Sequence, residues 1–174
     1  MKKYLVLCLA VAAIVPAQAR NTTYKLPLAD VLQMPEAKVK LDGSVKFFFG
    51  ENTIPQGAER KGVEVIDRHA RVKAASKEDF AACRGRSAMP TDLCGTQHAN
   101  DPSDDDVASC KAAALQALIA LQDNAKRRGA NAVVDFVSDY KGQTFSSATE
   151  YECHAGATGG HLTFKANYAS VPKQ

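Results

Sequence analysis

Residues 104–129 read DDDVASCKAAALQALIALQDNAKRRG and carry the clearest structural signal in the chain. Apolar side chains recur there at three- and four-residue spacing, namely Val107, Cys110, Ala114, Leu118, Leu121 and Ala125. This period predicts one long amphipathic helix with a single apolar stripe. The aspartates at 104–106 predict its N-cap, where negative charge suits the helix dipole. The basic residues at 126–128 and Gly129 predict its C-terminus.

Three strands are predicted after this helix. Residues 132–140 (AVVDFVSDY) are dense in β-branched and aromatic side chains, and a short turn leads into a return strand over 144–154. A bulge or slip near Ser146 is left open. A glycine turn at 156–160 leads into 161–170, where apolar and polar residues alternate. This alternation predicts one face on a core and the other toward water.

Shorter elements are predicted before the helix. The apolar pattern of residues 28–40 suits one short helix, or two helices broken at Pro35. Residues 44–49 (SVKFFF) read as a strand, and residues 63–67 read as a second strand, with its continuation to Val72 left open.

These elements together predict an α+β fold in two layers. A single helix can cover only one face of a sheet, so we expect one long helix on a mixed or antiparallel sheet of about five strands. The length of 20–174 suits a single domain. Residues 74–106 lack sustained periodicity and are interpreted as a surface insertion in that domain.

Residues 1–19 are predicted to be a signal peptide rather than part of the fold. A lysine pair at 2–3 precedes an apolar run, and AQA at 17–19 matches an A-x-A cleavage site. The apolar run is too short to span a bilayer, so we expect a periplasmic or secreted protein with no membrane span. Cys8 raises the alternative of a lipoprotein, but Leu7 stands where a small residue is expected.

The charge balance argues against a nucleic-acid partner. Removal of the signal peptide takes away two of the 22 basic residues and none of the 19 acidic ones, which lowers the formal net charge from +3 to +1. Binding to nucleic acid relies on a clustered basic surface, and this chain shows none in its sequence.

The cysteines predict a disulfide framework. Five cysteines become four without the signal peptide, and four cysteines in an oxidising compartment allow three pairings. Cys110 lies on the helix stripe and Cys153 on the expected inward face of the return strand, so we favour Cys110–Cys153 together with Cys83–Cys94. The long-range bridge should contribute about 3–5 kcal/mol. A bridged Cys153 also cannot be a catalytic nucleophile.

His154 and His161 are the candidate metal ligands, although only weak ones. No H-x-x-x-H or C-x-x-C pair is present, and adjacent strand residues such as Cys153 and His154 face opposite sides. We therefore favour a solvent-facing role for His154, and interpret His69 and His98 as isolated surface histidines. The acids that could assist such a metal are Glu150, Glu152 and Asp135.

Other functional motifs are incomplete. The acidic run at 101–106 lacks the glycine and the final glutamate of a calcium loop. The glycines at 156–160 lack the lysine of a phosphate loop, and a strand rather than a helix follows them. No Ser–His–Asp order is recognisable. We therefore expect no catalytic residues and no cofactor, unless a deep pocket forms around Asp135, Tyr151 or His161.

Three blocks carry a resemblance: LPLADVLQMPEAKVKLDGSVKFFFG (26–50), ALIALQDNAKRRGANAVVDFVSDY (117–140) and FSSATEYECHAGA (145–157). They resemble a family of small secreted proteobacterial proteins of unknown function, often labelled "excinuclease ATPase subunit". This chain has neither a phosphate loop nor zinc cysteine pairs, so the activity in that label is not expected.

More distantly, the helix followed by GANAVV (129–134) and a cysteine-bearing strand is similar to the periplasmic domain of the Rcs envelope-stress lipoprotein and to YbjQ-like domains. The similarity implies a disulfide-bonded α+β domain that acts by contacting partners rather than by catalysis. This chain lacks a lipobox and a long proline-rich linker, so anchoring and signalling do not carry over.

The leading hypothesis is therefore a non-enzymatic periplasmic or secreted module, which interacts with another envelope protein or resembles an envelope sensor. The alternative is a periplasmic protein that binds a small ligand or a metal through His154 and His161.

Overall fold

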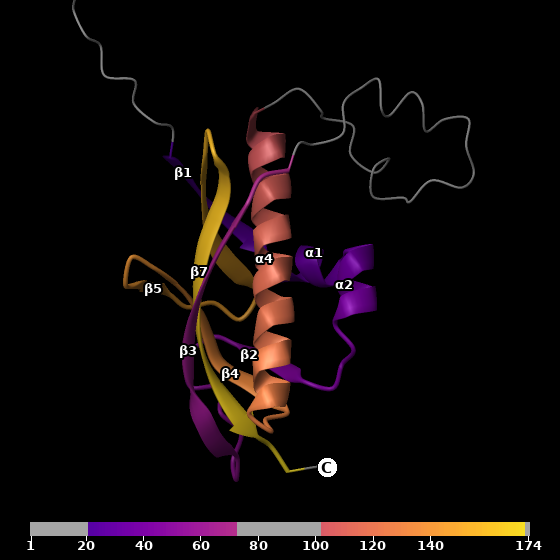
Figure 1. The fold of residues 1–174 in the computed structure, drawn as a ribbon. Helices are drawn as coiled ribbons and strands as arrows, with labels where there is room; N and C mark the ends of the chain where they lie inside the picture. Colours follow the sequence, from indigo (N-terminus) through magenta and orange to yellow (C-terminus); the bar gives the residue numbers. More distant parts are fainter. Residues whose placement is uncertain (1–20, 73–101, 173–174) are drawn as a thin grey trace, which may run out of the picture.

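The structure is a computed structural model that describes residues 21–72 and 102–172. Figure 1 shows one long helix, α4, lying against a strongly curved sheet, with two short helices on the same side as α4. The expected signal peptide lies outside the described residues. The same holds for the expected insertion as far as residue 101, which includes Cys83, Cys94 and His98.

Ten helices and strands make up the described parts of the chain. In chain order they are β1 (Asn21–Pro27), α1 (Leu28–Gln33), α2 (Pro35–Lys40), β2 (Lys46–Phe49), β3 (Glu59–Ala70), α4 (Pro102–Arg127), β4 (Ala132–Tyr140), β5 (Gln143–Phe145), β6 (Glu150–Gly156) and β7 (Gly159–Ser170).

The strand β7 organises the sheet. One of its edges pairs with β3 along almost its whole length. Its other edge pairs first with β6 and then with β4, so the sheet divides along β7 into two branches. β1 extends the β6 branch, and β2 extends the β4 branch in parallel. β5 folds back on β4 as a short hairpin that projects away from α4 (Figure 1).

The expected two-layer α+β fold with about five strands is wrong. The sheet has seven strands of mixed direction, curls into a half-barrel around one long helix, and makes the molecule mostly sheet, with 45% strand and 30% helix. Part of the curl has a local cause, because β-bulges increase strand twist. Register shifts interrupt β4 between Val134 and Val137, where Asp135 has φ of +49°, and interrupt β3 between Arg60 and Gly62.

Several individual elements agree with the sequence pattern. The segment before β2 forms two helices separated at Met34, as the proline at 35 suggested. The strand expected at 63–67 extends over the whole of β3. The return strand expected at 144–154 is instead split into β5 and β6, and β6 pairs with β1 and β7 rather than with β4.

The C-terminus of α4 lies where the sequence predicts it, whereas the N-terminus does not. The helix begins at Pro102, so Asp104 and Asp105 lie inside its first turn, where they face the positive end of the dipole, and the expected N-cap is wrong. The C-terminus is confirmed. Gly129 has φ of +65°, and the backbone N–H of Ala130 donates to the carbonyl of Ala125 at 2.9 Å.

The core lies between α4 and the face of the sheet toward it, which we call the inner face. The buried stripe of α4 is rich in small side chains, which bring the helix close to the sheet. Facing it are Leu162, Phe164, Ala166 and Tyr168 of β7, all buried. The closest approach is at Gly160, where a Cβ atom would lie 2.6 Å from the backbone nitrogen of Cys110.

A second, smaller cluster lies on the opposite, outer face. Ala132, Val134 and Ala169 are buried there beneath Ile54 and Ala58 of the loop between β2 and β3. This loop covers the outer face near the C-terminal end of β7. The outer face near the start of β7 carries the polar groups described next.

Candidate functional site

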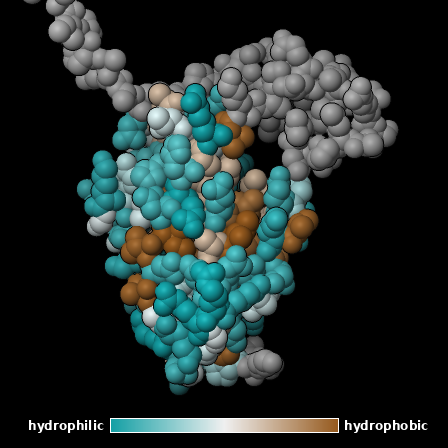
Figure 2. Space-filling view, viewed as in Figure 1, coloured by the Kyte–Doolittle hydropathy of each residue, from teal (hydrophilic) through white to brown (hydrophobic). Residues whose placement is uncertain are grey.

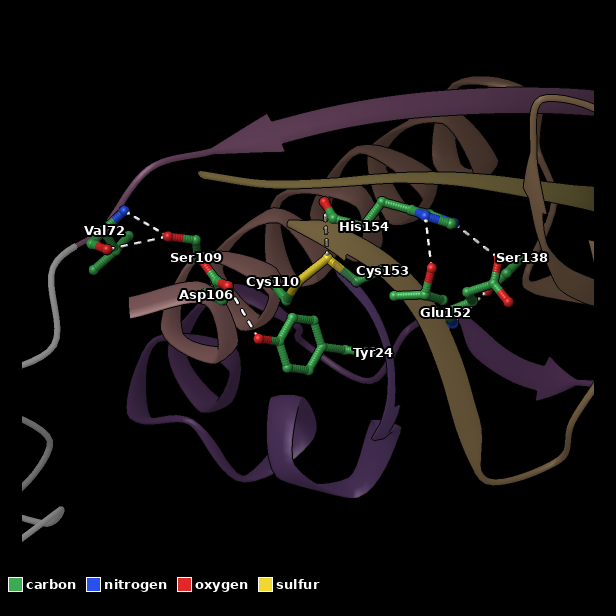
Figure 3. The surroundings of a disulfide bond; sticks show 10 residues. Tyr24, Val72, Asp106, Ser109, Cys110, Ser138, Glu152, Cys153 and His154 are labelled. Carbon is green, nitrogen blue, oxygen red and sulfur yellow. Dashed lines mark hydrogen bonds and ion pairs between the residues drawn. A yellow bond between two sulfur atoms is a disulfide. The ribbon is translucent and has the colours of Figure 1, made fainter. Parts of the chain in front are cut away.

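A disulfide joins the helix to the sheet. Cys110 of α4 and Cys153 of β6 are both fully buried, with Cα atoms 5.9 Å apart, and Figure 3 shows the bond crossing between the helix and the sheet. The pairing expected from the sequence is therefore confirmed for these two residues. The 43-residue separation corresponds to about 4 kcal/mol of stabilisation through the entropy of the unfolded chain. Cys153 is not a free thiol.

Polar contacts hold the start of α4 beside this disulfide. The hydroxyl of Ser109 accepts a hydrogen bond from the backbone N–H of Val72 at 2.9 Å and also contacts its carbonyl at 3.1 Å. The hydroxyl of Tyr24 donates to Asp106 at 3.0 Å (Figure 3). The start of the helix is thus fastened to the end of β3 and to β1.

Three histidines lie side by side on the outer face. His154 is directly opposite His161 across the β6–β7 hairpin, and His161 is directly opposite His69 on β3. Directly opposed residues share a face of a sheet, so all three side chains belong to the outer face. We call His69, His154 and His161 the histidine row. Thr23 continues the same line on β1.

The side chain of His154 is held by contacts with three neighbouring residues. Its Nδ1 lies 3.2 Å from the hydroxyl of Thr23, and its Nε2 lies 2.9 Å from a carboxylate oxygen of Glu152. The ring of Tyr140 stacks on it with centroids 3.6 Å apart, and the side chain is only 11% exposed. Because both ring nitrogens are engaged, His154 is a structural residue, and the expectation that it faces solvent is wrong.

His161 and His69 are more open. Nε2 of His161 contacts a carboxylate oxygen of Asp67, and its ring meets the edge of Tyr140 at 5.3 Å between centroids. Within residues 21–72 and 102–172, neither Nδ1 of His161 nor the ring of His69 has a hydrogen-bond partner. The two rings lie edge to face, with centroids 6.4 Å apart.

The remaining candidates do not join this row. Asp135 lies under the loop that covers the outer face, where its carboxylate accepts from Thr53 at 2.9 Å and pairs with Arg60 at 3.3 Å. Tyr151 lies on the inner face, where burial, reinforced by the charge of Asp30, raises its pKa well above the usual value for a phenol. The sequence leaves open a pocket at Asp135, Tyr151 or His161. The structure does not bring the three side chains together, because Tyr151 lies on the inner face and Asp135 contacts Asn167, six residues along β7 from His161.

The weak metal-ligand candidates His154 and His161 do not belong to a larger group of ligands among the described residues. In the described part of the chain, no three or more His, Cys, Asp or Glu side chains are grouped to hold an ion. His154 and His161 do face each other, but both rings pack on Tyr140. Sequence reasoning missed the position of His69, because the register that places it opposite His161 depends on two strands more than 90 residues apart.

Among the described helices, none is both long and apolar enough to cross a bilayer. Comparisons of the chain with protein-family models, with curated proteins and with solved structures found no match. The features of the molecule that bear on function are the disulfide, the strand edges and the histidine row.

Proposed function

We propose that this protein is a non-enzymatic interaction module of the cell envelope or the secreted fraction. In this proposal it binds an extended segment of another envelope protein along the free edge of β3. The observation that carries it is the length and openness of that edge. β3 has 12 residues, and in the described chain its only strand partner is β7.

The side chains of β3 favour such a partner. Val63 and Val65 project from the outer face and are each 55% exposed. Natural edge strands are commonly protected from pairing by charges or bulges. β3 has such protection only near its ends, where charges and a bulge occur: Arg60, Lys61 and the bulge near its start, and Asp67 and Arg68 near its end. Its centre carries the two exposed valines and lacks this protection on the outer face.

The distribution of exposed aliphatic side chains supports the same proposal. Figure 2 shows a mainly hydrophilic face with separate hydrophobic patches. Three other large aliphatic residues are exposed in the described parts of the chain. Leu32 and Val39 lie on the short helices, and Val72 lies just after β3. A peptide that adds to a sheet edge gains backbone hydrogen bonds, and its alternate side chains could cover the valines.

The edge is held rigid from its inner side. Glu64 accepts hydrogen bonds from Asn124 at 2.7 Å and from Tyr168 at 2.6 Å, and pairs with Arg128 at 3.5 Å. Val72, just after the strand, is fastened to Ser109. A strand that is already ordered loses little conformational entropy on binding, which favours affinity.

The proposed compartment follows from the disulfide together with the sequence. Bridges such as Cys110–Cys153 persist in oxidising compartments and are rare in the cytosol. The signal peptide expected at 1–19 would deliver the chain there. Partners in the proposal are accordingly proteins of the envelope.

Site-specific photo-crosslinking in cells tests the proposal. A crosslinking amino acid at Val65 should capture one recurring envelope protein through an extended segment, whereas the same group at Val39, which is 80% exposed on α2, should not. Val65→Lys should abolish capture from a crosslinker placed at Val63 without changing the melting temperature. Capture of identical proteins from Val65 and Val39, or capture from Val63 that survives Val65→Lys, would contradict the proposal.

A further inference from the structure

We propose that His69 and His161 together bind one divalent transition-metal ion of the Cu²⁺, Ni²⁺ or Zn²⁺ class on the outer face. The two residues are directly opposed on the antiparallel strands β3 and β7. This site goes beyond the proposed binding of a partner at β3 and does not depend on it.

The distance between the two rings suits a shared ion. Two imidazoles bound to one metal, with metal–nitrogen bonds of about 2.0–2.1 Å, have ring centroids roughly 5–6 Å apart. The observed centroids of His69 and His161 are 6.4 Å apart. His69 is exposed, so its side chain has room to rotate toward His161.

Asp67 prepares His161 as a ligand. Its carboxylate contacts Nε2, and an Nε2–H that donates to this carboxylate leaves Nδ1 with a free lone pair. Metal-binding histidines generally donate their second N–H to a carboxylate or carbonyl, which fixes the tautomer and the ring orientation. The edge contact with Tyr140 restrains the same ring from another side.

The availability of nitrogen atoms separates this pair from His154. Both nitrogens of His154 are occupied by Thr23 and Glu152, and its ring is stacked and mostly buried. His69 and Nδ1 of His161 have no hydrogen-bond partner among the described residues. The pair therefore supplies two ligands, and water completes the coordination of an exchangeable ion.

The ligand chemistry determines which ions bind. Imidazole nitrogen suits Cu²⁺, Ni²⁺ and Zn²⁺, and the general order of stability places Cu²⁺ first. Mg²⁺ and Ca²⁺ prefer oxygen ligands and should not bind here. A site with two protein ligands should also release its metal readily to a strong chelator.

Calorimetric titration of the purified, oxidised mature chain without a histidine tag tests this site. We expect one Cu²⁺ per chain, weaker Ni²⁺ and Zn²⁺, and no Mg²⁺. His69→Asn should weaken Cu²⁺ binding at least tenfold, and the same is expected of His161→Asn. Asp67→Asn should weaken it by about tenfold, as loss of an orienting carboxylate typically does. His154→Asn is the matched control and should leave the affinity unchanged.

The chain has four histidines, so each can be replaced in turn and the four variants compared. His69 is exposed, so its variant should keep the melting temperature of the wild type and remain informative even if His161→Asn is unstable. Absence of Cu²⁺ binding, or binding that survives His69→Asn and is lost in His98→Asn or His154→Asn, would overturn the assignment. Selective broadening of the His69 and His161 imidazole NMR signals by substoichiometric Cu²⁺ would support it.

Discussion

Tyr151 and Tyr168 are both buried on the inner face, but their hydroxyl groups differ in hydrogen bonding. Burial is the main cause that raises the pKa of each side chain. The hydroxyl of Tyr168 donates to Glu64 at 2.6 Å, whereas that of Tyr151 is buried without a hydrogen-bond partner among residues 21–72 and 102–172. A buried polar group left unpaired costs about 1–3 kcal/mol, so the two hydroxyls should affect stability in opposite ways.

This contrast gives a matched pair of substitutions. Tyr151→Phe removes an unpaired hydroxyl and should leave the free energy of unfolding unchanged or raise it by up to about 1 kcal/mol. Tyr168→Phe removes a hydrogen bond to a carboxylate and should lower it by about 1–2 kcal/mol. Urea unfolding of both variants measures the difference. A larger loss in Tyr151→Phe than in Tyr168→Phe would show that the first hydroxyl is paired.

The sequence could predict some of these residue contacts and not others. The Cys110–Cys153 pairing was predictable because two local periodicities, one helical and one of a strand, placed both sulfurs on faces that meet. The approach of His69 to His161 depends on the pairing of β3 with β7, for which neither strand carries a local signal. The burial of His154 likewise depends on Tyr140 and Thr23, which come from two other strands.

At the scale of elements, the glycine-rich turn between β6 and β7 has a packing role besides reversal of the chain. The loop itself contains only two residues, and Gly159 and Gly160 already belong to β7. A side chain at Gly160 would collide with the backbone of α4 at Ser109 and Cys110. Turn formation was therefore an incomplete explanation of these glycines.

We expect Gly160→Ala to lower the free energy of unfolding by about 3 kcal/mol, at the upper end for overpacking, because the added Cβ meets backbone held by the disulfide. The control is Gly129→Ala. Gly129 has a positive φ, but no atom of the described residues lies within 4 Å of an added Cβ, so its substitution should cost only about 1–2 kcal/mol of backbone strain. Thermal unfolding ranks the two variants, and a smaller loss at Gly160 would contradict the close packing of β7 on α4.

Elements with strong local patterns were predicted, and elements defined by pairing were not. α4, β4 and β7 have clear periodicity, and their approximate limits were found. β1 (NTTYKLP) is mostly polar and alternates only between exposed and half-buried positions, so nothing marked it as a strand before its pairing with β6 was known. The break between β5 and β6 also follows from tertiary pairing rather than from local preference.

At the scale of the whole molecule, the disulfide links the helix to the β6 branch of the divided sheet. Replacing both Cys110 and Cys153 by alanine should lower the free energy of unfolding by about 4 kcal/mol, chiefly through the entropy of the unfolded chain. Chemical denaturation of the double variant and of the wild type, both kept oxidised, measures this loss. A loss below about 1 kcal/mol would mean that the bridge does not stabilise the scaffold.

The fold class was mispredicted because strand number and sheet curvature are properties of the whole molecule. The pattern revealed five strands and one covering helix, from which a two-layer arrangement followed. The two strands that the pattern did not separate, β1 and β5, pair with β6 and β4 rather than with β7. The bulge at Asp135 falls within a segment whose sequence looks like a regular strand. Curvature of this kind arises from register shifts between strands, which one strand's sequence does not encode.

The proposed interaction module requires a rigid scaffold in which the Cys153 sulfur is bonded and unreactive. Peptide mapping by mass spectrometry, on native protein alkylated without reduction, tests this most directly. We predict a peptide pair that joins Cys110 to Cys153, with no alkylation of either residue. Alkylated Cys153, or Cys153 linked to Cys83 or Cys94, would contradict the account and restore a reactive thiol as the candidate site.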